Sequence, residues 1–311
     1  MDTPLKMINK LIIPPTNLEL IVVDHCNITC RSCNHASPML PNWFADPDTV
    51  YRDLLILAKH YRPPFVKIIG GEPLMHKHLD AVIHAARASK ISDYFKLITN
   101  GTLIHEASDA IWEALDEVEI SCYPGVRNTQ NNIILAKEKA LFFGKKLTIF
   151  RYENFRETLS LKSSVDQRLI NKLFAACKIA RLWGCHAVRQ GYFYMCPQSI
   201  YIPILTGKSA ENDRLLIEDS SAFHQKLANF LNPSSPLESC ANCTGSNGRQ
   251  NPHELLPRRQ WSADICKPIE DMVDYALLEK SLVVQNRADD CKIPSGLTSI
   301  ISRFNSFFIN K

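Results

Sequence analysis

Apolar runs of strand length alternate with helix-like segments over the first 177 residues, and this alternation is the strongest constraint on the fold. Repeated βα units give parallel strands joined by right-handed crossovers. We therefore predict an α/β fold built on a partial, open (β/α) barrel of five to six parallel strands. The strand-like runs lie at residues 18–23, 65–69, 94–99, 118–123 and 147–151. One helical pattern begins at Asp46-Pro47, and further helical patterns lie near residues 78–88, 104–115, 128–143 and 166–177.

Chemistry in such folds gathers at the carboxyl ends of the strands. Three cysteines in a C-x3-C-x2-C loop, Cys26, Cys30 and Cys33, follow the first strand. Three thiolates can hold three irons of a [4Fe-4S] cube and leave the fourth iron open for an external ligand. Gly70-Gly71-Glu72-Pro73 ends the second strand, where paired glycines permit close backbone approach and a carboxylate can receive an ammonium group.

Together these motifs resemble those of the radical S-adenosylmethionine (radical SAM) superfamily, over about residues 18–150 and less closely over 180–245. The resemblance implies that the open iron chelates the methionine part of SAM and that the glycine-rich strand end holds its amino group. The sequence departs from the family at Ser32, where an aromatic or bulky apolar residue usually helps to pack the adenine. A structural zinc site is the alternative, although zinc knuckles favour C-x2-C pairs.

Alternation on the fourth strand separates two sets of side chains. Glu119, Ser121 and Tyr123 share one face, while Ile120 and Cys122 share the other. We expect the polar face to line the barrel cavity, with Ser121 pointing at SAM as the matching serine does in the family, and Cys122 to face the helices. Arg151, which ends the fifth strand, can bind the SAM carboxylate or the substrate. A surface ion pair is the alternative role for this residue. The predicted SAM-binding residues are Gly70, Gly71, Glu72, Asn100, Ser121 and Arg151.

A second group of cysteines follows residue 177. Residues 185–196 indicate a β-hairpin that turns at Gln190-Gly191, and a two-residue turn would place Cys185 and Cys196 opposite each other on one face. A C-x2-C pair, Cys240 and Cys243, lies further along. Four convergent thiolates form a closed site, suited to zinc or to a fully ligated cluster.

The G-x4-C element that ends at Cys196, with its distant C-x2-C pair, resembles the twitch domain, a shortened SPASM domain of radical SAM enzymes. That resemblance implies one auxiliary [4Fe-4S] cluster. We predict Cys185, Cys196, Cys240 and Cys243 as its ligands, with Cys177 as the substitute for Cys185, since the family spacing to the glycine suits Cys177 better. Zinc is the alternative at this site too.

A helix predicted over residues 297–309 is expected to dock on the body of the protein. The predicted organisation of the chain has four parts. They are an N-terminal extension (1–17), the radical SAM barrel (18–177), the auxiliary-cluster domain (178–261) and a C-terminal helical segment (262–311).

Composition excludes several classes of protein. With 45% hydrophobic and 22% charged residues and a net charge of +4, the chain is an ordinary globular protein without the basic excess that nucleic-acid binding requires. Eleven cysteines in 311 residues do not fit a small disulfide scaffold. We find no signal peptide and no apolar run of membrane-spanning length, and expect a cytoplasmic protein whose thiolates remain available to metal.

The resemblance implies reductive cleavage of SAM, with electrons from a donor such as flavodoxin or ferredoxin, and removal of a hydrogen atom from a small substrate. An auxiliary cluster would accept the remaining electron, so we predict oxidation of a hydroxyl of a sugar or aminocyclitol. Epimerisation is an alternative, with Cys122, Cys266 or Cys291 as the hydrogen donor. Ribosomal-peptide maturation is another, disfavoured because 17 residues before the first strand are too few for a leader-binding domain. A zinc-binding module for RNA or protein is the non-enzymatic alternative.

Overall fold

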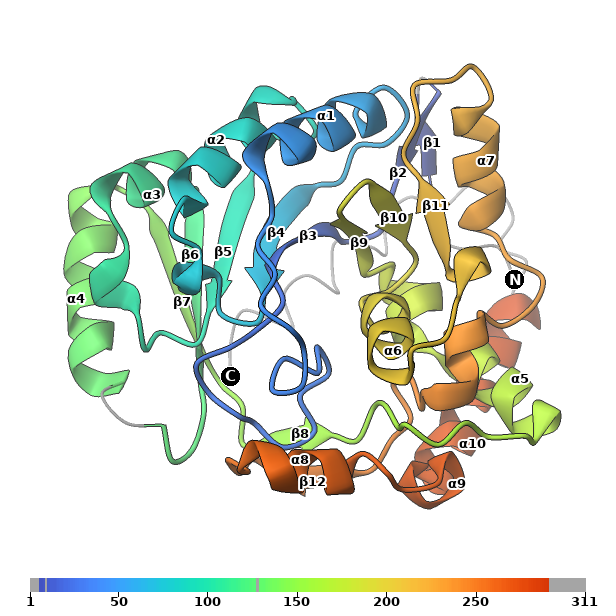
Figure 1. Cartoon of the computed structure of the whole chain (residues 1–311). Coiled ribbons are helices and arrows are strands. Elements are labelled where there is room, and N and C mark those ends of the chain that lie inside the picture. The colour runs from blue at the N-terminus through green and yellow to red at the C-terminus, as the bar shows by residue number, and fades with distance from the viewer. Residues whose placement is uncertain (1–5, 9, 127–128, 291–311) are drawn as a thin grey trace.

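Six parallel strands form the centre of the molecule (Figure 1). The computed structural model describes residues 6–8, 10–126 and 129–290, and within them the largest sheet has eight strands. Its parallel part runs in the order β9 (His186–Arg189), β3 (Asn17–Val23), β4 (Phe65–Gly70), β5 (Phe95–Thr99), β6 (Glu117–Cys122) and β7 (Lys146–Arg151). The α/β fold with a partial barrel of five to six parallel strands is therefore confirmed.

The sixth parallel strand comes from a part of the chain that was assigned to the cysteine-rich region. Strand β9 pairs with β3 and begins the hairpin that continues through β10 (Tyr192–Tyr194) to β11 (Arg214–Leu216). The sheet thus runs without a break across the predicted domain boundary at residues 177–178.

Four helices cover the outer face of the parallel strands (Figure 1). Helix α1 begins where the sequence predicts, because the Asp46 carboxylate accepts a hydrogen bond from the Thr49 amide and Pro47 occupies the first turn. The predicted helix at 104–115 is divided, since Ser108 caps a new helix after a short 3-10 turn, η2 (Ile104–Glu106). The four are α1 (Pro47–Leu57), α2 (Leu79–Ala88), α3 (Asp109–Ala114) and α4 (Thr129–Phe142).

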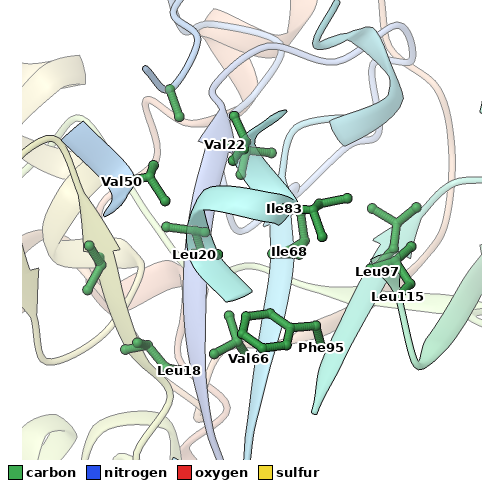
Figure 2. Packing of buried hydrophobic residues seen from close by; sticks show 14 of the residues in the cluster. Leu18, Leu20, Val22, Val50, Val66, Ile68, Ile83, Phe95, Leu97 and Leu115 are labelled. Atoms are coloured by element: carbon green, nitrogen blue, oxygen red, sulfur yellow. The ribbon is translucent and has the colours of Figure 1, made fainter. Parts of the chain in front are cut away.

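The main core lies between these helices and the sheet (Figure 2). Leu18, Leu20 and Val22 of β3 alternate with residues that point to the opposite face, and Val66 and Ile68 of β4 do the same. Burial of each such side chain contributes about 1.5–3 kcal/mol to folding. On β4 and β5, buried and partly buried positions alternate, which fixes the register of these strands and sends the intervening side chains into the barrel.

The C-terminal half packs beside the open edge and beneath the barrel (Figure 1). None of the helices in the described part of the chain is long and apolar enough to span a membrane. The predicted helix at 297–309 lies outside the described residues. The remaining helices are α5 (Gln167–Ala176), α6 (Gln198–Thr206), α7 (Phe223–Phe230), α8 (Arg258–Asp264), α9 (Ile269–Met272) and α10 (Tyr275–Asp290). The remaining strands are β1 (Lys6–Ile8), β2 (Leu11–Ile13), β8 (Asn154–Arg156) and β12 (Gln250–Pro252). Short helical turns are η1 (Pro73–Met75), η3 (Ile179–Trp183), η4 (Glu211–Asp213) and η5 (Glu238–Asn242).

Candidate active site

A cavity of about 370 Å³ opens at the carboxyl ends of the parallel strands. It contains most of the residues that the sequence indicates for the cofactors, contributed by the ends of β3 to β6 and by the loop after β3. The predicted residues that line it are Cys26, Cys30, Cys33, Gly70, Gly71, Asn100 and Ser121. Motifs separated by nearly a hundred residues thus meet at one place, as expected at this edge of a parallel sheet.

The paired glycines fit the cysteine loop to the sheet. A Cβ atom on Gly70 would lie 2.1 Å from the Val23 carbonyl oxygen, and one on Gly71 would lie 1.9 Å from that of His25. The Gly71 amide instead donates to the Val23 carbonyl at 2.8 Å. Both glycines are therefore required by contact between two strand ends, in addition to the ligand approach that the sequence suggests.

The three thiols of the loop are partly or fully buried. Burial raises the pKa of Cys26 to about 12 and also raises the pKa of Cys30 and of Cys33. The Asn100 side-chain amide lies 3.6 Å from the Cys26 sulfur and donates to the Asn27 side chain at 2.9 Å. A donor set of three clustered thiols, with an amide directed at sulfur, fits an iron–sulfur cluster whose positive iron would stabilise the thiolates.

The outer side of this loop is held by a segment far along the chain. The Trp261 indole donates to the Cys30 carbonyl at 2.8 Å, and the Arg31 amide donates to the Glu254 carbonyl at 2.8 Å. The Arg31 guanidinium also pairs with the carboxylates of Glu254 at 2.5 Å and Asp264 at 3.0 Å. These contacts anchor the loop between the sheet and α8, and more than 220 residues separate the partners, so no local pattern signals them.

Glu72 lies behind the cavity wall. Its fully buried carboxylate accepts hydrogen bonds from the Leu74 amide (3.1 Å), the Thr99 hydroxyl (2.7 Å) and the Asn100 amide (2.7 Å). Burial raises its pKa to about 7. Glu72 thus ties the end of β4 to the end of β5, and its three donors already occupy the oxygens expected to receive an ammonium group. Direct contact with SAM stays a prediction.

Replacing Glu72 with glutamine distinguishes a structural role, in which Glu72 ties β4 to β5, from direct contact with SAM. An amide in this place sets its NH2 group against at least one of the three donors, so we expect a loss of about 1–3 kcal/mol in stability. Thermal unfolding and equilibrium dialysis with SAM measure both effects. Thr99→Val, which removes one donor to the carboxylate, is the matched variant. A direct ammonium contact predicts a different outcome: SAM affinity falls about ten- to a hundredfold with stability unchanged.

Strand β6 presents its polar face to the cavity, as its alternation predicts. Glu119, Ser121 and Tyr123 line the cavity, while Ile120 belongs to the main core and Cys122 packs against that core. The orientation of both faces follows from the period of two.

Arg151 does not take the place predicted for it. It is exposed and is absent from the cavity lining, because it follows Leu147 and Ile149 on the face of β7 that packs toward the helices. The cavity has another cation, Arg156 of β8, whose guanidinium donates to the Gly248 carbonyl. Burial lowers the pKa of Arg156. No sequence pattern singles out Arg156, since β8 is placed by its pairing with β12.

The second group of cysteines gathers around a small apolar cavity of about 30 Å³. Its cysteines are Cys177, Cys196, Cys240 and Cys243. Cys185 is not among the lining residues. Burial raises the pKa of Cys240 and of Cys243 well above the usual range, and neighbouring thiols add to the effect.

The predicted hairpin forms, but it ends too early to oppose Cys185 and Cys196. Its turn at Gln190-Gly191 has two residues with positive φ, 49° and 82°, as a two-residue hairpin requires. Pairing stops at Ala187 and Tyr194, so the chain at Cys196 leaves the ladder and enters α6. Cys185 lies outside the small apolar cavity but near Cys177 and Cys196 as well as Glu19 and Lys67, and burial together with the Glu19 charge raises its pKa to about 12.

Cys177 reaches the group from the end of α5. A Cβ atom on Gly245, which has φ +58°, would lie 2.8 Å from the Cys177 sulfur, so this close approach requires glycine. The Gly245 amide donates to the Cys243 sulfur at 3.2 Å. Four buried or partly buried thiols with an amide donor fit a closed cluster site. Among the described residues, no three His, Cys, Asp or Glu side chains are arranged to hold a single metal ion.

The two groups of cysteines share a wall. Leu159 and Cys243 form an antiparallel bridge, and the Thr244 amide donates to the Thr158 carbonyl at 2.9 Å. Thr158 itself lines the larger cavity. The segment that carries Cys243 is thus hydrogen-bonded directly to the lining of the candidate SAM site.

Comparison with curated proteins finds partial matches. The chain is 32% identical over 112 residues to the GTP 3′,8-cyclase of Mycobacterium marinum, covering 34% of this chain and 31% of that protein. It is 29% identical over 109 residues to the probable GTP 3′,8-cyclase of Pyrococcus horikoshii, covering 35% and 34%. The chain thus matches about a third of the length of these relatives. No protein-family model matches it.

Solved structures give weaker matches. BtrN in complex with AdoMet and 2-DOIA matches with a TM-score of 0.45 and 14% identity, over 75% of this chain and 94% of that chain. The structure titled anSMEcpe with bound AdoMet and Cp18Cys peptide matches with a TM-score of 0.46 and 12% identity, over 88% and 100%.

Over the third of the chain that matches the cyclases, the similarity supports the resemblance to the radical SAM superfamily, whose members use a [4Fe-4S] cluster and S-adenosylmethionine.

Proposed function

We propose that the chain reductively cleaves SAM at a [4Fe-4S] cluster held by Cys26, Cys30 and Cys33 and removes a hydrogen atom from a small polar substrate. When bound, such a cluster supplies the electron that breaks a carbon–sulfur bond of SAM. The observation that carries the proposal is the shared cavity, which brings all three thiols to both glycines and to the polar face of β6. An external reductant such as flavodoxin or ferredoxin supplies the electrons.

The walls of the cavity offer contacts for each part of SAM. Asn100 and Ser121 present polar atoms at the strand ends, and the backbone of Gly71 lines the wall that the methionine part can approach. Arg156, in place of Arg151, is the cation that can receive the SAM carboxylate.

The adenine contact that Ser32 does not supply can come from an aromatic wall. Tyr123, Tyr152 and Phe155 line the cavity, and Tyr123 stacks on His253 with ring centroids 5.1 Å apart. Phe155 meets Tyr123 edge to face at 5.3 Å. Planar, apolar faces of this kind pack well against a purine ring.

We further propose an auxiliary [4Fe-4S] cluster at Cys177, Cys196, Cys240 and Cys243 and, with it, a two-electron oxidation. All four positions would be filled by protein, which suits electron transfer better than binding of substrate. The hydrogen-bonded wall between Cys243 and Thr158 supports this role. Cys122 supports it indirectly, since this thiol packs toward the helices and cannot return a hydrogen atom to the cavity.

The substrate class that we propose is a hydroxylated small molecule such as a sugar or aminocyclitol. The relatives act on GTP by name, which makes nucleotide cyclisation the second candidate. The cavity lining does not favour a triphosphate, because the cations Lys67 and Arg156 are matched there by the carboxylates Glu19 and Glu119. A phosphate-rich ligand would require an excess of positive charge.

Isotope transfer tests the proposed outcome. A substrate that carries deuterium at the reacting carbon should pass its label to 5′-deoxyadenosine, because that carbon loses its hydrogen to the adenosyl group. The product should be lighter than the substrate by two hydrogens, as read by mass spectrometry. A product isomeric with the substrate, with solvent deuterium at carbon, would show epimerisation instead. A cyclised product of unchanged mass would support the nucleotide candidate.

A further inference from the structure

One row of charged side chains crosses the inside of the barrel on four adjacent strands. Glu19 of β3 pairs in register with Lys67 of β4, which pairs with Lys96 of β5, which pairs with Glu117 of β6. The strand neighbours of Glu19, Lys67 and Lys96 belong to the main core, as does Val118 beside Glu117, so alternation directs all four away from that core and into the barrel.

Lys96 and Glu117, which form one half of this row, have ionic and hydrogen-bond partners within the protein. The Lys96 ammonium lies 3.0 Å from the Glu117 carboxylate and 2.5 Å from that of Glu119. Glu117 also accepts from the Tyr94 hydroxyl at 2.9 Å and from the Thr148 hydroxyl at 2.7 Å. These charges are satisfied within the protein, as buried charges must be.

The other half of the row, Glu19 and Lys67, remains open toward the cavity. The closest ionic partners of Glu19 in the described chain are Lys67 at 3.8 Å and the His35 Nε2 atom at 4.0 Å, both beyond hydrogen-bond distance. The Glu19 side chain is 8% exposed, and within the described part of the chain its buried Oε2 atom has no hydrogen-bond partner. Glu19, Lys67 and His35 all line the cavity. A buried carboxylate oxygen without a donor is costly unless a ligand supplies one.

A hydrogen bond fixes the orientation of the His35 ring. Nδ1 lies 2.8 Å from the Gly70 carbonyl oxygen, which can only accept, so Nδ1 carries the proton. The other nitrogen, Nε2, faces the Glu19 carboxylate. The open half thus places the Glu19 carboxylate, which accepts, and the Lys67 ammonium, which donates, beside the free edge of the His35 ring.

We propose that Glu19, Lys67 and His35 form the subsite that binds adjacent hydroxyl groups of a neutral polyol substrate. One hydroxyl donates to Glu19, and its neighbour accepts from Lys67. The charges of Glu19 and Lys67 cancel, so the subsite suits a ligand without net charge and selects against phosphorylated ones. The subsite lies deeper in the barrel than the strand ends that carry Gly70 and Ser121, which leaves those ends to SAM. The inference rests on the proposed function and names its substrate class.

Binding without turnover tests the subsite. The full chain, reconstituted anaerobically, loaded with SAM and left unreduced, is titrated with myo-inositol, D-glucose and D-glucose 6-phosphate by ligand-observed NMR. Glu19→Gln and the charge-neutral double variant Glu19→Gln/Lys67→Met are compared with Lys59→Met, which breaks an exposed ion pair to Asp219 outside the cavity. Thermal unfolding shows that each variant is folded.

We expect one of the two neutral polyols to bind the wild type more tightly than the phosphate, and the cavity variants to lose about ten- to a hundredfold in affinity while Lys59→Met is unchanged. Absence of binding by both neutral polyols, or equal binding by the cavity variants, would overturn the subsite. Formation of 5′-deoxyadenosine after reduction is measured on the same samples without polyol. Its absence from the wild type would refute the proposed function, whereas its presence beside failed polyol binding would refute the subsite alone.

Discussion

Replacing Cys26, Cys30 and Cys33 together with alanine is expected to abolish the formation of 5′-deoxyadenosine from SAM in reduced protein. The three thiols line one cavity with both glycines, and no described cysteine outside this loop lines that cavity to replace them. The triple variant should retain about four of about eight iron atoms per chain, held by the second group of cysteines. Chromatography of the nucleoside products and iron analysis measure both quantities.

The matched control for this experiment is the double variant Cys122→Ala/Cys266→Ala. Both residues are free cysteines, and neither lines either of the two cysteine-containing cavities. This variant should keep the full iron content and the full rate of SAM cleavage. Retained cleavage in the triple variant, or its loss in the control, would contradict the assignment.

Cys177→Ala is expected to remove the auxiliary cluster, whereas Cys185→Ala should retain it. Cys177 lines one cavity with Cys196, Cys240 and Cys243, while Cys185 does not line that cavity. Loss of one of four ligands should lower the iron content by up to about four atoms per chain and remove one of two reduced-cluster signals in electron paramagnetic resonance.

The comparison of the two cysteines carries its own control, because both are buried or partly buried thiols in the same region. An effect of general instability would show in thermal unfolding of either variant. The reverse pattern, with iron lost from Cys185→Ala and kept in Cys177→Ala, would show that Cys185 is the ligand, as the sequence predicts. Tetrahedral zinc in the anaerobically purified wild type would refute the auxiliary cluster altogether.

The parts of the fold that follow from local pattern could be predicted from the sequence. Apolar runs of strand length predict the parallel strands, and alternation correctly sends Ser121 inward and Cys122 outward. The motifs after β3 and β4 meet because parallel strands end at one edge. Charges at Glu19 and Lys67 within apolar strands also indicate an interior polar site.

Other parts depend on contacts between distant segments. The sequence favours Cys185 because a hairpin would oppose it to Cys196, but the length of the ladder is set by where α6 begins. Arg156 enters the cavity because β8 pairs with β12, nearly a hundred residues later. Trp261 reaches the Cys30 carbonyl across 231 positions. No periodicity or spacing encodes such contacts, because they arise when the elements pack.

Electron paramagnetic resonance of the reduced, reconstituted protein, before and after addition of SAM, tests the central claim most directly. An open iron at the Cys26, Cys30 and Cys33 loop should bind SAM and change one reduced-cluster signal, leaving the auxiliary signal unchanged, and 5′-deoxyadenosine should accumulate in the same sample. A protein that holds zinc in place of iron, or cluster signals that SAM leaves unaltered with no 5′-deoxyadenosine formed, would contradict the account.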